Sequence, residues 1–151
     1  MAASIASTGT SCMSVKTFVD SNILLYAHDW DAGSKQRIAE GILSELWDSR
    51  SGVVSPQVLQ EFYVNAIRKL AKRLERPFAQ SIVEKYANWC IETTPAEVLS
   101  AFRIEREAKI SFWDALIVAS AAKAGAEVLL SEDLSSGQTV AGVRVRNPFV
   151  R

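Results

Sequence analysis

The chain has 151 residues, the size of a single domain, and roughly 70% of the unfolded surface of such a chain is buried on folding. It carries 17 basic and 17 acidic residues, so its formal net charge is zero, and 48% of its residues are hydrophobic. These values exclude a wholly disordered chain. They also argue against a heavily basic nucleic-acid binder, although an acidic site and a basic surface can cancel in the sum.

The N-terminal segment, the two cysteines and the apolar runs bear on domain bounds and cellular location. Residues 1–14 hold no charge and are rich in Ser, Ala and Thr, so we expect a disordered tail before a domain at 15–151. Met13 is an alternative start, which would make the preceding residues an upstream extension. Cys12 and Cys90 lack the spacing of a zinc site and favour reduced thiols in the cytoplasm. We expect no signal peptide and no membrane span, because no apolar run approaches ~18 residues.

Short β-branched runs alternate with longer helical patterns along the chain. In chain order we predict a strand at Val15–Val19, helices at Asn22–Asp29 and Ser34–Ser49, a strand at Gly52–Val54, helices from Pro56 to about Leu74 and at Phe78–Trp89, a strand at Cys90–Glu92, helices from Thr94 to about Lys109 and at Phe112–Lys123, and strands at Glu127–Leu130 and Val143–Val145. Strands separated by helices predict an α/β fold with a mainly parallel sheet. Functional sites in such sheets form at the carboxyl ends of the strands.

Two acids stand at the starts of helices. Asp20 ends the first predicted strand, and Asp114 lies in the first turn of a helix that is apolar on every side. Each has a local explanation, because Asp is a good helix cap and Ser111 with Asp114 resembles a capping box. A partly buried carboxylate nevertheless needs a partner, a proton or a cation, which makes both residues candidates for a site.

Two further acids complete the candidate set. Asp133 follows a strand, with Glu132 as its neighbour, and an ordinary acidic turn would explain both. We favour Asp133 over Glu132. Glu61 lies on the helix from Pro56, on the side opposite the apolar residues, where a solvated helix face is the simpler interpretation.

Taken together, these acids predict a metal site. Parallel topology would bring the strand-end acids and the acid of the apolar helix to one edge of the sheet. Clustered carboxylates persist only with raised pKa values or a bound cation. Oxygen ligands without His or Cys suit Mg²⁺, with Mn²⁺ as a substitute. Such an ion supports phosphodiester hydrolysis, whereas a single histidine, His28, excludes nucleases that need a histidine pair.

The motifs that carry these acids resemble those of PIN-domain nucleases, and most of all the toxin ribonucleases of VapBC-type toxin–antitoxin modules. The resemblance covers about residues 15–150 and rests on Phe18–Asn22 (FVDSN), Glu61, Phe112–Ala119 (FWDALIVA) and Leu130–Leu134 (LSEDL). It implies a PIN-like three-layer α/β/α sandwich and a metal-dependent endoribonuclease.

The resemblance also implies roles for individual residues and partners. Asp20, Asp114, Asp133 and Glu61 would hold one or two Mg²⁺ ions, while Asn22 and Ser131 would orient ligands or the attacking water. The acidic doublet leaves open whether Glu132 or Asp133 is the fourth acid. Family members resemble one another in forming homodimers and in being silenced by a small VapB-type antitoxin that places a basic side chain in the acidic site.

A dense basic run lies between Arg68 and Arg76. A solvated helix end would explain it, but a ridge from Glu61 through Asn65 to Arg68 and Lys72 could also contact RNA phosphates. Among the aromatic residues, Trp47, Trp89 and Trp113 are predicted to lie in the core, and Trp30 to be exposed.

Two alternatives to a nuclease remain from the residues. A catalytically silent PIN-like module that binds RNA or protein would need none of the four acids. A phosphatase of the haloacid-dehalogenase type would need Asp-x-Asp after the first strand, and Asn22 occupies the third position. A dinucleotide-binding domain is excluded, because no glycine-rich turn follows that strand.

Overall fold

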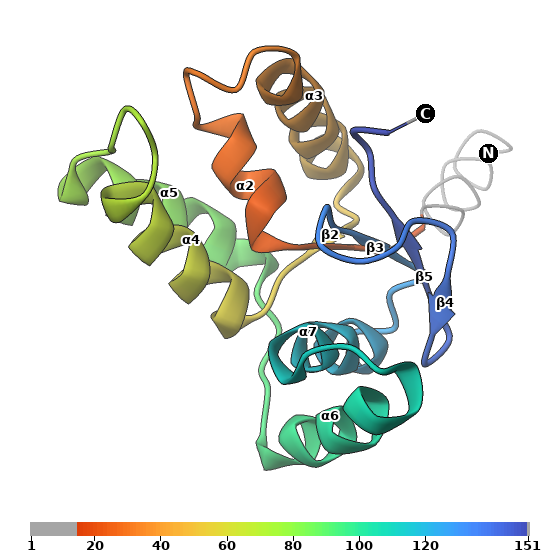
Figure 1. Ribbon diagram of the computed structural model, residues 1–151. Helices are drawn as coiled ribbons and strands as arrows, with labels where there is room; N and C mark the ends of the chain where they lie inside the picture. Colours follow the sequence, from red (N-terminus) through yellow and green to blue (C-terminus); the bar gives the residue numbers. More distant parts are fainter. Residues whose placement is uncertain (1–14, 151) are drawn as a thin grey trace, which may run out of the picture.

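A computed structural model describes residues 15–150 of the chain. The tail predicted for residues 1–14 lies outside the described residues. The elements are β1 (Thr17–Val19), α2 (Ser21–Ala27), α3 (Ser34–Ser49), β2 (Gly52–Val53), α4 (Pro56–Arg68), α5 (Arg76–Tyr86), the 3-10 helix η1 (Ala87–Trp89), α6 (Pro95–Ala108), α7 (Phe112–Lys123), β3 (Val128–Leu130), β4 (Thr139–Val140) and β5 (Val143–Arg146). Figure 1 shows their arrangement.

The five strands form one sheet in the order β2-β1-β3-β5-β4. The pairs β1–β2, β1–β3 and β3–β5 are parallel, with Thr17 opposite Gly52 on one side and Val128 on the other. Only β4 runs antiparallel, in a hairpin with β5. Because β1 lies between β2 and β3, the carboxyl ends of the two central strands are adjacent. The predicted α/β fold with a mainly parallel sheet is therefore confirmed.

Helices cover the sheet on both faces. Helices α6 and α7 pack together on one face, where α7 contacts β3 and β5, and α2 and α3 lie on the opposite face (Figure 1). Helices α4 and α5 form a pair that contacts α2. The central strands are buried, with Phe18, Val19 and Leu129 fully enclosed. This enclosure explains why β1 and β3 consist almost entirely of apolar residues.

Three predicted elements differ from the structure. The helix predicted at Phe78–Trp89 is replaced by α5, which ends at Tyr86, and the 3-10 helix η1. Helix α4 ends at Arg68 instead of continuing to Leu74, and Lys69 is its C-cap. A longer helix would place like charges four residues apart, as in Arg68 and Lys72, which is unfavourable. The strand predicted at Cys90–Glu92 is reduced to a single parallel bridge between Val54 and Cys90. The short strand β4 has no counterpart in the predicted elements.

The structure also corrects the predicted core. Trp113 is 62% exposed and Trp47 is exposed as well, whereas Trp89 is partly buried; Trp30 is exposed, as predicted. The error at Trp113 arose because α7 is apolar on every side, so periodicity does not distinguish its buried face. Cys90 is a free thiol. Among residues 15–150, no helix combines the length and the apolar character needed to cross a bilayer.

Candidate active site at the carboxyl ends of β1 and β3

Asp20 is the buried centre of the candidate site. It directly follows β1, its backbone N–H donates to the carbonyl of Leu130 at the end of β3 (3.0 Å), and the residue is only 3% exposed. Its Oδ1 accepts a hydrogen bond from the backbone N–H of Ser21 (2.7 Å), and its Oδ2 accepts one from Ser131 Oγ (2.7 Å). The two central strands thus hold this carboxylate in a single orientation.

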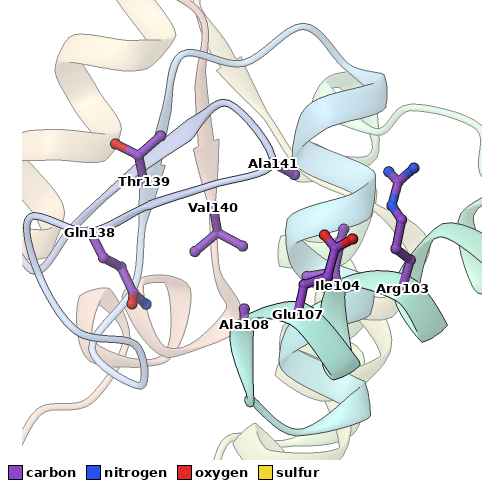
Figure 2. A pocket seen from close by; sticks show the side chains of 8 residues that line it. All are labelled: Arg103, Ile104, Glu107, Ala108, Gln138, Thr139, Val140 and Ala141. Carbon is purple, nitrogen blue, oxygen red and sulfur yellow. The ribbon is translucent and has the colours of Figure 1, made fainter.

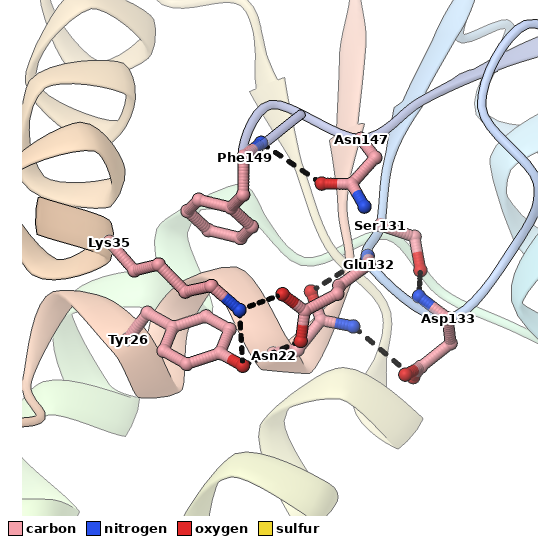
Figure 3. Close-up of polar contacts among 8 residues, drawn as sticks. All are labelled: Asn22, Tyr26, Lys35, Ser131, Glu132, Asp133, Asn147 and Phe149. Carbon is pink, nitrogen blue, oxygen red and sulfur yellow. Dashed lines mark hydrogen bonds and ion pairs between the residues drawn. The ribbon is translucent and has the colours of Figure 1, made fainter. Parts of the chain in front are cut away.

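The loop after β3 brings Asp133 to the same place. Ser131 is fully buried, and its Oγ accepts a hydrogen bond from the backbone N–H of Asp133 (3.1 Å). Asn22, in the first turn of α2, donates from Nδ2 to Asp133 Oδ2 (3.2 Å; Figure 3). It also donates, at 3.5 Å, to Asp20 Oδ2. Ser131 and Asn22 therefore each form hydrogen bonds with both Asp20 and Asp133.

Glu61 and Asp114 approach from two other helices. Glu61 lies on α4, and its Oε1 accepts a hydrogen bond from Ser21 Oγ (3.2 Å). Gln57, one turn earlier, donates to Glu61 Oε2 (3.4 Å) and to the carbonyl of Trp113 (3.2 Å), which links α4 to the start of α7. Asp114 is half-buried in the first turn of α7, where its backbone N–H donates to Ser111 Oγ. Glu61 thus faces other side chains and not open solvent.

The acids influence one another electrostatically. Burial raises the pKa of Asp20 to about 7, against the hydrogen bonds from Ser131 and Ser21, and the charges of Asp133 and Glu61 raise it further. Burial also raises the pKa of Glu61 and of Asp114, and in both cases the charge of Asp133 adds to the effect. The four carboxylates therefore form one electrostatic cluster, as expected for like charges brought close together.

Glu132 is separate from this cluster. Its carboxylate contacts Lys35 Nζ and Tyr26 Oη, both at 2.5 Å (Figure 3). Burial alone would raise the pKa of Glu132, but the hydrogen bonds from Lys35 and Tyr26 lower it. Of the acidic doublet, Asp133 is thus the residue that shares a hydrogen-bond partner, Asn22, with Asp20. The Glu132 carboxylate is instead paired with the ammonium group of Lys35.

The cluster matches a hard divalent cation in donor chemistry and charge. All four side chains offer carboxylate oxygens, which Mg²⁺ and Mn²⁺ prefer. None of the ion pairs among the described residues involves any of the four acids. As the side chains stand, however, no group of three or more among the described His, Cys, Asp and Glu residues is in position to hold a metal ion.

The predicted basic ridge is not continuous. Arg68 is exposed at the last position of α4, but Lys72 lies in the turn that follows and pairs with Asp31 at 3.8 Å. The chain turns back there: the backbone N–H of Leu74 donates to the carbonyl of Ala66, and the Leu74 side chain is buried. Arg68 and Lys72 therefore lie on the two sides of a helix end and do not form one helical row.

Several contacting residues were missed by sequence reasoning. Ser21, Gln57, Tyr26 and Lys35 all touch a candidate site residue, yet only Gln57 carried a usable signal, since it stands four residues before Glu61 on the same helix. His28 packs its ring edge-on against Phe62.

A surface pocket elsewhere does not coincide with the acids. It lies between α6 and the β4–β5 hairpin and is lined by Arg103, Ile104, Glu107, Ala108, Gln138, Thr139, Val140 and Ala141 (Figure 2).

Comparisons with known proteins identify the family. The PIN domain family model matches residues 17–135, so the chain belongs to the PIN domain family. No curated protein sequence matched the chain. Among solved structures, a chain of the VapBC2 complex from Rickettsia felis, crystallised with a promoter DNA fragment, is 17% identical; the match covers 87% of this chain and 97% of that one, with a TM-score of 0.59.

Two further structures give similar values. A chain of DNA-bound VapBC from Salmonella typhimurium is 16% identical, and the match covers 89% of this chain and 99% of that one, with a TM-score of 0.61. The sarcin–ricin-loop-cleaving toxin VapC20 of Mycobacterium tuberculosis is 19% identical over 76% of this chain and 87% of that one, with a TM-score of 0.56. The fold is therefore that of the toxins in VapBC-type complexes, and the resemblance seen in the motifs is confirmed at the level of family and fold.

Proposed function

We propose that this protein is a Mg²⁺-dependent endoribonuclease and the toxin of a VapBC-type toxin–antitoxin pair. The observation that carries the proposal is the convergence of Asp20, Glu61, Asp114 and Asp133 at one edge of the sheet, without a basic partner among the described residues. A binding module that does no chemistry has no use for four mutually repelling carboxylates.

Each side chain has a role in this proposal. Asp20, Asp114 and Asp133 would hold the ion, and Glu61 is a fourth carboxylate that can hold an ion or bind the attacking water. Ser131 and Asn22 donate to Asp20, and Asn22 also donates to Asp133, so they fix the orientation of these ligands. When bound, Mg²⁺ lowers the pKa of water and offsets charge on the scissile phosphate. Mn²⁺ has the same oxygen preference and is expected to substitute.

The proposal includes three partners: an antitoxin, a second copy of the chain and the RNA substrate. The uncompensated acids suit a basic side chain of a VapB-type antitoxin, and two of the similar structures are VapBC complexes. Exposed apolar side chains on α6 and at the start of α7, Leu99, Phe102 and Trp113, support a homodimer. Arg68 and Lys72 would contact RNA phosphates. We propose a cytoplasmic location, which suits an RNA substrate and the reduced cysteines expected from the sequence.

The test uses expression in cells without any antitoxin. Wild type and Asp114→Asn are induced, growth is followed, and new RNA 5′ ends are mapped across the transcriptome, with Asp48→Asn at the exposed end of α3 as a matched control. We expect growth arrest and a few sharp new ends for wild type and Asp48→Asn. For Asp114→Asn we expect at least ~100-fold fewer ends, because even residues behind metal ligands contribute ~10–100-fold.

A second experiment, with purified protein, decides the case in which expression causes no growth arrest and no new RNA ends. Stable wild type with no arrest and no new ends would favour a silent PIN-like module that binds RNA or protein. If purified wild type also fails to bind Mn²⁺ and to cleave total cellular RNA, the nuclease proposal is wrong.

A further inference from the structure

The Glu132 carboxylate contacts side chains from two helices, α2 and α3. Tyr26 Oη, on α2, donates to Glu132 Oε1, and Lys35 Nζ, on α3, pairs with Oε2, both at 2.5 Å. Lys35 Nζ also lies 3.4 Å from Tyr26 Oη, so the three polar groups form a closed triangle (Figure 3). Both oxygens of the Glu132 carboxylate are therefore occupied on the side of the loop away from the acid cluster.

The segment after β5 covers this triangle. The Phe149 ring meets the Tyr26 ring edge-on, with centroids 5.0 Å apart. Lys35 Nζ lies 4.8 Å from the centroid of the Tyr26 ring and 5.4 Å from that of Phe149, which are cation–π distances. The Phe149 backbone N–H donates to Asn147 Oδ1 (2.9 Å) within this segment, and the backbone N–H of Ser131 donates to the carbonyl of Arg146 (3.1 Å), which joins the end of β5 to the loop. The triangle thus ties together three parts of the chain that are distant in sequence.

A second set of contacts connects the triangle to the acids. The backbone N–H of Glu132 donates to Asn22 Oδ1 (3.3 Å), and Asn22 Nδ2 donates to Asp133 Oδ2 (3.2 Å). Asn22 and Tyr26 stand four residues apart and so share one face of α2. The same helix face therefore binds the backbone of Glu132 through Asn22 and its side chain through Tyr26.

We propose that Lys35 and Tyr26 are positioning residues, which hold Glu132 and thereby set the loop of residues 131–133 so that Ser131 and Asp133 face Asp20. The inference rests on the proposed metal site. In this role Glu132 is neither a ligand nor a spare acid: its side chain anchors the loop, and its neighbour Asp133 faces the site.

The energetics favour positioning over bulk stability. The Lys35 side chain is 41% exposed, and an ion pair with this much solvent exposure contributes little to the folding free energy. Groups behind metal ligands, in contrast, fix ligand orientation, and their loss weakens metal affinity by 10–100-fold. A pure charge effect has the opposite sign, because removing the positive Lys35 near an acid cluster would strengthen the binding of a cation.

The opposite signs give a direct test. Mn²⁺ binding to the full chain is measured by isothermal titration calorimetry without RNA, for wild type, Lys35→Met, Lys35→Arg and Tyr26→Phe. The matched control is Lys123→Met, which removes the other lysine paired with a glutamate, Glu97, at 3.1 Å and similar exposure. Thermal unfolding of each variant checks that it is folded.

We expect Lys35→Met to bind Mn²⁺ about tenfold more weakly than wild type, by loss of ligand orientation. Tyr26→Phe, which removes one hydroxyl, should weaken binding several-fold. Lys35→Arg, which keeps the cation, should restore most of the affinity, and Lys123→Met should bind like wild type.

Other results overturn the inference in distinguishable ways. Equal or tighter binding by Lys35→Met, with wild type binding normally, would show that Lys35 acts only through its charge. If Lys35→Met does not fold, Tyr26→Phe decides, and unchanged affinity in that variant contradicts the proposal. If wild type itself binds no Mn²⁺, the proposed metal site fails and the positioning role fails with it.

Discussion

Asp20 and Asp114 each combine a local role with a place in the cluster. Asp20 is the N-cap of α2, where Oδ1 accepts from the N–H of Ser21, and Asp114 follows the Ser111 cap of α7. The sequence offers a helix cap and a functional site as alternative interpretations of these acids, and the structure is compatible with both at once. The reason is geometric: a carboxylate has two oxygens, so Asp20 uses one for its helix and leaves the other toward Ser131 and the loop after β3.

The raised pKa of Asp20 predicts a pH-dependent stability of the metal-free protein. Its pKa is raised from 3.8 to about 7, so the folded chain binds this proton more tightly than the unfolded chain. The stabilisation is complete below the unfolded value and is lost as pH rises through the folded value. At ~1.4 kcal/mol per pKa unit, we expect the free energy of unfolding to fall by a few kcal/mol between pH 4 and pH 8.

Urea unfolding in excess EDTA at several pH values measures this effect. Asp20→Asn should flatten the dependence and be more stable than wild type at pH 8, whereas added Mg²⁺ should stabilise wild type but not the variant. Asp48→Asn, on an exposed turn of α3, is the control and should follow wild type. Parallel curves for wild type and Asp20→Asn would contradict the assignment of the shift to Asp20.

At the scale of elements, helices with clear periodicity or caps are the best predicted. Helices α3 and α7 have the predicted bounds, and α6 begins at the predicted Thr94, its N-cap, which forms a capping box with Glu97. The error at Cys90–Glu92 has a packing cause. Trp89 packs against β2 at Gly52, and the chain after it makes only one bridge, between Val54 and Cys90, so Cys90–Glu92 does not become a strand.

This contact makes Gly52 a sensitive position. A Cβ built on Gly52 would meet the Trp89 ring at 2.7 Å, so we expect Gly52→Ala to destabilise the fold by ~1–3 kcal/mol through overpacking. Gly41, inside α3, is the matched control, because a Cβ there meets nothing within 4 Å. Gly41→Ala should therefore stabilise the helix by ~0.5–1 kcal/mol. Thermal or urea unfolding measures both, and an equal effect of the two substitutions would refute the role of Trp89.

At the scale of the whole molecule, zero net charge conceals a separation of charge. Acids gather at the carboxyl ends of β1 and β3, whereas the chain around the end of α4 is basic. Arg68 and Lys72 remain close to this end, although the helix does not continue between them. A substrate with a charged backbone would contact the basic region, and its scissile phosphate would reach the acids only with a cation present.

The salt dependence of RNA binding tests the basic region. In an Asp114→Asn background, which should not cleave, Arg68→Ala with Lys72→Ala should reduce the slope of log affinity against log salt by about 1.4, at ~0.7 per phosphate contact for a single strand. Binding of a mixed-sequence single-stranded RNA oligonucleotide is measured by fluorescence anisotropy. Arg103→Ala with Arg106→Ala, two exposed cations on α6, is the control pair. An unchanged slope in the first pair would show that these residues make no phosphate contacts.

The amino-acid sequence by itself determined the α/β class, most helices and the four acids, because alternation, caps and strand-end positions are local patterns. Only the tertiary structure decided which face of each element is buried and which side chains meet. In the structure Glu61 faces Ser21, Trp113 is exposed and α4 ends at Arg68. Glu132 pairs with Lys35, and Asp133 lies beside Asn22. These outcomes depend on contacts between residues as many as 111 positions apart, and a local pattern carries no information on which distant side chain will occupy a given oxygen or cover a given ring.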